Sequence, residues 1–172
     1  MERFATASRL GITARPMTDA DYAFSEALYA STRAREVAQT GWPAELQRGF
    51  LAQQHAAQHE HYRVHYAAAD RWIIEADGAA IGRLYLFAGE RETRIVDVAL
   101  MPEWRGHGIG SALLADVIAE AHAAGRLVSI HVEKHNPARR LYLSLGFTVT
   151  DVDRGVYELL ELPPPDQKNT AS

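Results

Sequence analysis

The chain has 172 residues, of which 47% are hydrophobic and 23% charged, and a formal net charge of −4 at pH 7. This length and composition predict one globular domain with a full hydrophobic core and leave no room for a second. The negative charge argues against a general nucleic-acid-binding protein, and the lack of cysteine excludes disulfides, thiolate metal sites and a cysteine nucleophile.

Neither a signal peptide nor a membrane-spanning segment is evident in the sequence. Residues 1–16 lack an apolar stretch of signal-peptide length, and no run of about 18 apolar residues occurs anywhere. We therefore expect a protein of the cytoplasm with no membrane partner.

The first part of the chain predicts one strand and two helices. Residues 10–15 alternate in polarity as a strand does, and Pro16 ends the pattern. A helix then starts at the N-cap Thr18, with acidic residues in its first turn. A second helix is expected from Pro43 to about Tyr66. The first helix is expected to carry Tyr22, Leu28, Tyr29 and Val37 toward the core, and the second runs through Leu46, Phe50 and Leu51.

Four histidines of the second helix raise the question of a metal site. His55 with His59 and His61 with His65 form two pairs at i,i+4 spacing, but the pairs point about 200° apart on a helix and cannot share one ion. No acid is placed like the glutamate of an H-E-x-x-H motif. We expect no metal.

The rest of the chain predicts three antiparallel strands, a helix, a strand, a short helix and a final strand pair. The strands are expected at residues 72–76, 80–87, 95–101, 127–132, 147–152 and 156–162, and the helices at residues 111–125 and 138–145. The strand–helix–strand link makes strands 95–101 and 127–132 parallel. Residues 163–172, three prolines followed by mostly polar residues, predict a disordered tail.

The sequence RGHGIG at residues 105–110 joins the third of these strands to the helix after it. Its glycines leave no side chain over the turn, and the first helical turn adds unpaired N–H donors and the positive end of the helix dipole, which together favour phosphate. A P-loop would need a lysine before Ser111, and a dinucleotide-binding loop would need a different glycine spacing. A turn that serves packing alone remains an alternative at this point.

Two motifs together resemble those of the GNAT-type N-acetyltransferases. Residues 105–110 resemble the family's Arg/Gln-x-x-Gly-x-Gly/Ala loop, and residues 136–147, NPARRLYLSLGF, are similar to the segment with asparagine, Leu-Tyr and Gly-Phe that follows its fifth strand. The resemblance implies an α+β fold, with a mixed, mostly antiparallel sheet of about seven strands and about four helices. Strands 4 and 5 would be parallel and splayed, within a single domain of residues 1–162.

The resemblance further implies an enzyme that moves an acetyl group from acetyl-CoA to a primary amine of a small molecule, by direct attack in a ternary complex. The cofactor would lie where the two parallel strands separate, with its pyrophosphate on the backbone N–H groups of residues 105–111. Asn136 would bind the pantetheine arm, and Arg139 would approach the adenosine phosphate. The residues expected to bind acetyl-CoA are Val98, Ala99, Leu100, Met101, Arg105, Gly106, His107, Gly108, Ile109, Gly110, Ser111, Asn136, Arg139 and Tyr142.

Tyr142 is the expected general acid, because a nearby phenol can protonate the departing sulfur, and the N–H of Leu100 is the expected oxyanion donor. Asp97 is the first candidate for the general base. It is an acid in an apolar strand, so it either pairs with a group such as an arginine or takes part in catalysis. Weaker candidates for the base are Glu103, Glu133 and His131. For the other residues the alternatives are a helix cap for Asn136, a core aromatic for Tyr142 and a solvated charge for Arg139.

The residues that bind the acceptor are the hardest to predict from the sequence. Trp42 offers an aromatic face and Glu36 a negative charge for an amine, although Trp42 is as well explained by packing between two helices. A different class of function, a non-catalytic module that senses acyl-CoA, would keep the same fold. A final hairpin or an exposed sheet edge is the candidate surface for a homodimer.

Overall fold

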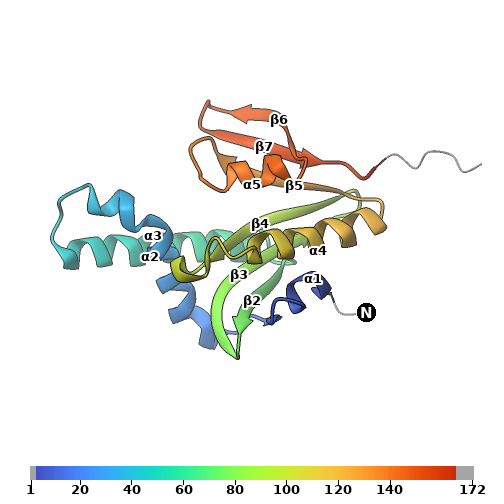
Figure 1. The fold of residues 1–172 in the computed structure, drawn as a ribbon. Helices are drawn as coiled ribbons and strands as arrows, with labels where there is room; N and C mark the ends of the chain where they lie inside the picture. Colours follow the sequence, from blue (N-terminus) through green and yellow to red (C-terminus); the bar gives the residue numbers. More distant parts are fainter. Residues whose placement is uncertain (1–2, 166–172) are drawn as a thin grey trace, which may run out of the picture.

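Seven strands form one sheet in the order β1-β2-β3-β4-β5-β7-β6 in the computed structural model, which describes residues 3–165 (Figure 1). The strands are β1 (Ile12–Pro16), β2 (Asp70–Ala76), β3 (Ala79–Ala88), β4 (Glu92–Leu100), β5 (Leu127–Glu133), β6 (Thr148–Asp153) and β7 (Tyr157–Leu162). The helices are α1 (Ala5–Ser8), α2 (Tyr22–Ala38), α3 (Ala44–His65), α4 (Ile109–Ala123) and α5 (Arg139–Ser144), with 3₁₀ turns at Asp19–Asp21 and Pro102–Trp104.

The predicted α+β fold with a mixed, mostly antiparallel sheet is confirmed. Every neighbouring pair of strands is antiparallel except β4 and β5, which are parallel. Of the predicted tail, residues 166–172 lie outside the described part, and residues 163–165 have no regular secondary structure. Within the described residues, no helix is long and apolar enough to cross a bilayer.

The predicted separation of the two parallel strands is present. β4 and β5 pair only from Glu92 with Leu127 to Ile95 with Ile130, although β4 continues to Leu100 and β5 to Glu133. A bulge coincides with the end of this pairing, because β3 joins Leu86 to Ile95 but Tyr85 to Asp97. An extra residue in one strand bends and twists it locally. The bulge therefore turns β4 away from β5 and opens a gap between their ends.

The two faces of the sheet carry different layers. On one face α4 packs on an apolar core, and α1 and α5 lie on the same side (Figure 1). The fully buried residues at its centre include Leu84, Leu113, Leu114, Val128 and Leu160. On the other face, α2 and α3 cover polar residues of β3 and β4. The alternation of a strand separates these faces, since neighbouring residues point to opposite sides.

One local prediction was wrong, and one helix was not predicted. Tyr22, expected in the core, is 36% exposed. The α2–α3 pair extends beyond the sheet (Figure 1), and Leu46 and Phe50 of α3 are 53% and 37% exposed. The unpredicted α1 is held by α4, where the Asp116 carboxylate accepts the N–H groups of Thr6 and Ala7 at 2.9 to 3.0 Å.

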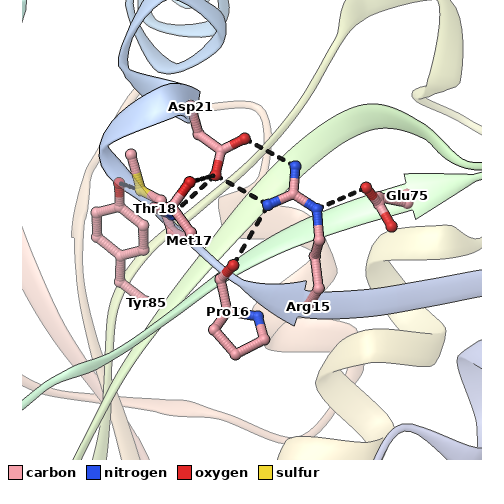
Figure 2. A network of polar contacts seen from close by, with 7 residues as sticks. All are labelled: Arg15, Pro16, Met17, Thr18, Asp21, Glu75 and Tyr85. Carbon is pink, nitrogen blue, oxygen red and sulfur yellow. Dashed lines mark hydrogen bonds and ion pairs between the residues drawn. The ribbon is translucent and has the colours of Figure 1, made fainter.

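A polar network ties the start of α2 to the edge of the sheet (Figure 2). Arg15 of β1 donates two hydrogen bonds to Asp21, at 2.7 and 2.9 Å, and one to Glu75 of β2 at 2.7 Å. Asp21 also accepts the N–H of Thr18 at 2.8 Å, which confirms the predicted helix start. The hydrogen bonds from Arg15 lower the pKa of Asp21. This anchoring fixes the start of α2 against the edge strands β1 and β2.

Candidate active site

The open ends of β4 and β5 expose backbone groups of β4 to the gap. Met101 donates its N–H to Ile81 of β3 at 2.8 Å, and the register pairs Leu100 with Gly82. In an antiparallel pair, residues that bond across the ladder alternate with residues whose N–H and C=O point away. The backbone groups of Val98 and Leu100 therefore face the gap that β5 has left. The C=O of Leu100 accepts the Arg105 side chain at 2.9 Å, so its N–H is the free group.

The loop before α4 presents a run of unpaired donors. The N–H groups of residues 106–111 donate no hydrogen bond to any residue between 3 and 165. Gly106 and Gly108 make this possible, because both have a positive φ, near +74° and +78°, that only glycine adopts freely. Arg105 differs, since its N–H bonds the C=O of Pro102 at 3.2 Å. Six consecutive free N–H groups at the start of a 15-residue helix fit a diphosphate.

Tyr142 lies in the core on the α4 side and is 3% exposed, with its ring edge-on to Phe147 at 5.8 Å. Its hydroxyl makes no hydrogen bond with the described residues. Burial and, second, the negative charge of Asp97 raise the pKa of the Tyr142 phenol. The group is therefore protonated at neutral pH, which is the state that a proton donor needs.

Asn136 and Arg139 both have partners inside the protein. The Asn136 side-chain oxygen accepts the N–H of Ala138 at 2.9 Å, as a cap of the turn before α5 does. Its amide nitrogen donates to none of the described residues. Arg139 bonds Glu158 of β7 through two nitrogens, at 2.5 and 3.2 Å. The predicted contacts of these two residues with acetyl-CoA stay predictions.

Asp97 points to the α2–α3 face, where it pairs with an arginine. Its Oδ2 accepts the Arg83 Nε–H at 2.5 Å, and the Arg83 side chain is only 4% exposed. Arg83 also donates to the Ser25 hydroxyl at 2.6 Å and to the Gln58 side chain at 2.8 Å. Asp97 thus belongs to a buried polar network. Sequence reasoning missed Arg83, although an arginine inside the apolar stretch 80–87 was a visible signal.

A second carboxylate lies at the end of β5. Glu133 is 3.8 Å from Arg33 of α2 and accepts the Tyr157 hydroxyl of β7 at 3.3 Å. Arg33 is closer to Glu36, at 3.0 Å. The other weaker candidates for the base, Glu103 in the 3₁₀ turn after β4 and His131 of β5, are exposed.

The predicted acceptor wall lies on the α2–α3 side. A groove of about 400 Å³ runs between these two helices, and its lining residue Ser31 is 3.4 Å from Arg105 of the glycine loop. Trp42, in the α2–α3 connection, packs edge-on against Phe50 at 5.4 Å and is 39% exposed. The roles of Glu36 and Trp42 in acceptor binding stay predictions. Among the residues described, no cluster of three or more His, Cys, Asp or Glu is arranged to hold a metal.

Known proteins match this chain both in sequence and in fold. Residues 31–147 match the model of the Acetyltransferase (GNAT) family. A stretch of 102 residues, 58% of this chain, is 36% identical to a mycothiol acetyltransferase from Nocardiopsis dassonvillei, of which it spans only 28%.

Solved structures give the same result for the fold. PaiA N-acetyltransferase from Thermoplasma acidophilum, in complex with coenzyme A, matches 88% of this chain and 98% of its own, with a TM-score of 0.66 and 18% identity. A GNAT family acetyltransferase from Elizabethkingia anophelis with acetyl-CoA bound matches 89% of this chain and 98% of its own, with a TM-score of 0.58 and 19% identity.

Proposed function

Because the chain belongs to the GNAT family of acetyltransferases, we propose that it moves the acetyl group of acetyl-CoA to a primary amine of a small molecule, by direct attack within a ternary complex. The observation that carries this proposal is the run of six N–H groups at residues 106–111, none of which bonds a residue between 3 and 165. Such a run at a helix start suits the diphosphate of coenzyme A.

The donor would lie along β4. The free N–H and C=O groups of Val98 and the free N–H of Leu100 would pair with the pantetheine arm as a neighbouring strand does, and the Asn136 amide would add a contact from the other side. The bound molecule supplies an activated acyl thioester. The N–H of Leu100 would then stabilise negative charge on the thioester oxygen during attack.

Tyr142 would act as the general acid. Its phenol is buried, protonated and without a hydrogen-bonding partner among the residues that the structure describes, so it can donate to a leaving sulfur. It belongs to the layer on the α4 side of the sheet. The acceptor would enter from the other face, where Asp97, Glu36 and Trp42 lie on or against α2 and α3 and where carboxylates attract an ammonium group.

The test mixes the protein with acetyl-CoA and a panel of small amines and follows release of the free thiol. Tyr142→Phe should lower kcat by about 100-fold or more, within the range for general acid catalysis, and leave the affinity for coenzyme A unchanged. Tyr66→Phe, a phenol on the far side of the sheet that packs against Phe87, is the matched control and should keep full activity.

Two outcomes would contradict the proposal. Binding of coenzyme A without thiol release on any amine would point to a sensor of acyl-CoA instead of an enzyme. Full turnover of Tyr142→Phe would remove Tyr142 from the acid role. Peptide amines in the same panel would separate small-molecule acceptors from protein acceptors.

A further inference from the structure

We propose that Glu133, at the end of β5, takes the proton from the acceptor's ammonium group, whereas Asp97 contributes a fixed negative charge that helps to orient it. This inference rests on the proposed transfer of acetyl to an amine and names the residue that makes the amine nucleophilic. It separates the roles of the two carboxylates that flank the gap.

The position of Glu133 follows from the register of the two parallel strands. The last paired residues are Ile95 and Ile130. Glu133 lies three residues beyond this pair on β5, and Val98 lies three residues beyond it on β4. Glu133 is therefore level, across the gap, with the β4 segment whose free N–H groups face the gap. A thioester held by that segment would lie between the two strands.

Strand alternation sets the face from which Glu133 acts. Ile130 and Val132 of β5 are both 5% exposed and belong to the core under α4. Glu133 points to the opposite face, where it meets Arg33 of α2. Tyr142 comes from the core on the α4 side. A base and an acid from opposite faces suit this reaction, because the amine arrives on one side of the carbonyl carbon and the sulfur leaves on the other.

The contacts of the two carboxylates differ in the way that the two roles require. Within residues 3–165, the side chain of Glu133 makes a loose ion pair of 3.8 Å and a long hydrogen bond of 3.3 Å and no other such contact, and it is 37% exposed. Asp97 holds a nearly buried arginine at 2.5 Å. Protonation of Asp97 would leave the charge of Arg83 uncompensated in the interior. Protonation of Glu133 leaves Arg33 with its closer partner, Glu36.

The proton balance is simple. Glu133 receives one proton of the ammonium and passes it to solvent. The nitrogen lone pair then forms the N–C bond, the C–S bond breaks, and the sulfur takes the proton of the Tyr142 hydroxyl. The remaining excess proton on nitrogen restores the phenol. The products are the N-acetyl amide, the free thiol of coenzyme A and one proton released to solvent.

The test compares pH profiles of kcat/KM for an accepted amine in the wild type and in Glu133→Gln. We expect the variant to lose about 100-fold at pH 7. Its activity should rise about tenfold per pH unit up to the pKa of the amine, because only acceptor already neutral in solution can react. Glu133→Asp should recover part of the loss. Glu60→Gln, a carboxylate paired with Arg63 at 2.6 Å and remote from the gap, is the control and should keep the wild-type profile.

Protection by coenzyme A against thermal unfolding checks that each variant is folded and binds the donor. Glu133→Gln with normal protection and the predicted pH profile supports the proposal. A variant that keeps kcat and raises only KM, or one within threefold of the wild type at every pH, overturns it. If the wild type itself releases no thiol on any amine, the proposed function fails instead, and the two failures are thereby distinguished.

Discussion

The proposed donor and acceptor sides of the gap between β4 and β5 offer different kinds of binding groups. On the donor side, the groups offered are backbone N–H donors, held by glycine conformations and free of partners in the described protein. On the acceptor side, side chains of α2, α3, β3 and β4 already bond one another. Main-chain recognition tolerates a varied sequence, whereas a side-chain network depends on every member. The acceptor side is therefore where single substitutions should have the largest effects.

Arg83 is the centre of the acceptor-side network. It donates to Asp97, Ser25 and Gln58, and its guanidinium lies over the Tyr85 ring at 5.3 Å. Because Ser25 accepts from Arg83, its own hydroxyl proton is free to go to Nε2 of His55, 3.0 Å away. This assignment gives His55 the neutral form with its proton on Nδ1, a buried atom with no hydrogen-bond partner in the described part of the chain.

The largest expected effect comes from removing this centre. Arg83→Met should lower the free energy of unfolding by about 3–5 kcal/mol, because it leaves Asp97 as an unpaired, largely buried charge. Urea unfolding at pH 7 measures it. Arg63→Met, which breaks the exposed pair with Glu60, is the matched control and should change stability little. Equal losses of unfolding free energy in the two variants would mean that the buried Arg83–Asp97 pair contributes no more to stability than the exposed Arg63–Glu60 pair does.

The second prediction concerns pH and the same network. Burial, with the charge of Arg83 second, lowers the pKa of His55 to about 4. In the unfolded chain His55 has its ordinary pKa near 6.5, so between pH 4 and 6.5 the unfolded state binds more protons than the folded state. The contribution of neutral His55 to stability is therefore complete above pH 6.5 and is lost as the pH falls toward 4. We expect the protein to be about 2 kcal/mol less stable at pH 4.5 than at pH 7 because of His55.

His55→Gln tests that assignment, because a glutamine oxygen can accept from Ser25 but cannot be protonated in this range. Its unfolding free energy should depend less on pH between 7 and 4.5 than that of the wild type. His59 has a lowered pKa as well, so part of the dependence should remain. If the unfolding free energy of His55→Gln depended on pH as strongly as that of the wild type, His55 would not be the cause of the pH dependence.

The same contrast explains what the sequence could predict. The glycine loop, the parallel strands and Tyr142 depend on residues close together in the chain, so local patterns identify them. The other members of the network around Asp97 come from three other elements, with Arg83 on β3 bonding Asp97 and also Ser25 on α2 and Gln58 on α3. No local pattern pairs residues so far apart in the chain. The exposure of Tyr22 was mispredicted for a related reason, since an apolar helix pattern does not tell which of its residues a second layer will cover.

The third prediction probes the donor side. Gly108→Ala should cost about 1 kcal/mol of stability, because alanine is strained at a φ near +78°, and it should weaken coenzyme A binding several-fold by disturbing the free N–H groups. Gly11→Ala is a matched control, since Gly11 has a φ of +74° with open space around the added carbon and lies outside the loop. It should lose similar stability and no affinity. Calorimetric titration with coenzyme A would measure the affinity of each variant, and thermal unfolding would measure its stability. Equal affinities of Gly108→Ala and Gly11→Ala for coenzyme A would argue that the loop does not hold the diphosphate.

The smallest expected effect concerns Trp42, at the outer end of the acceptor side. If its ring contacts a cationic acceptor, Trp42→Ala should raise the acceptor KM by about two- to fivefold, as an exposed cation–π contact would, and leave kcat unchanged. Phe50→Ala removes the ring that packs on Trp42 at 5.4 Å and should leave KM unchanged. If Trp42 only joins the two helices, both variants should lose comparable stability and neither should change KM. Steady-state kinetics beside thermal unfolding therefore decide whether recognition of the acceptor extends from the gap to the α2–α3 connection or ends at the buried network.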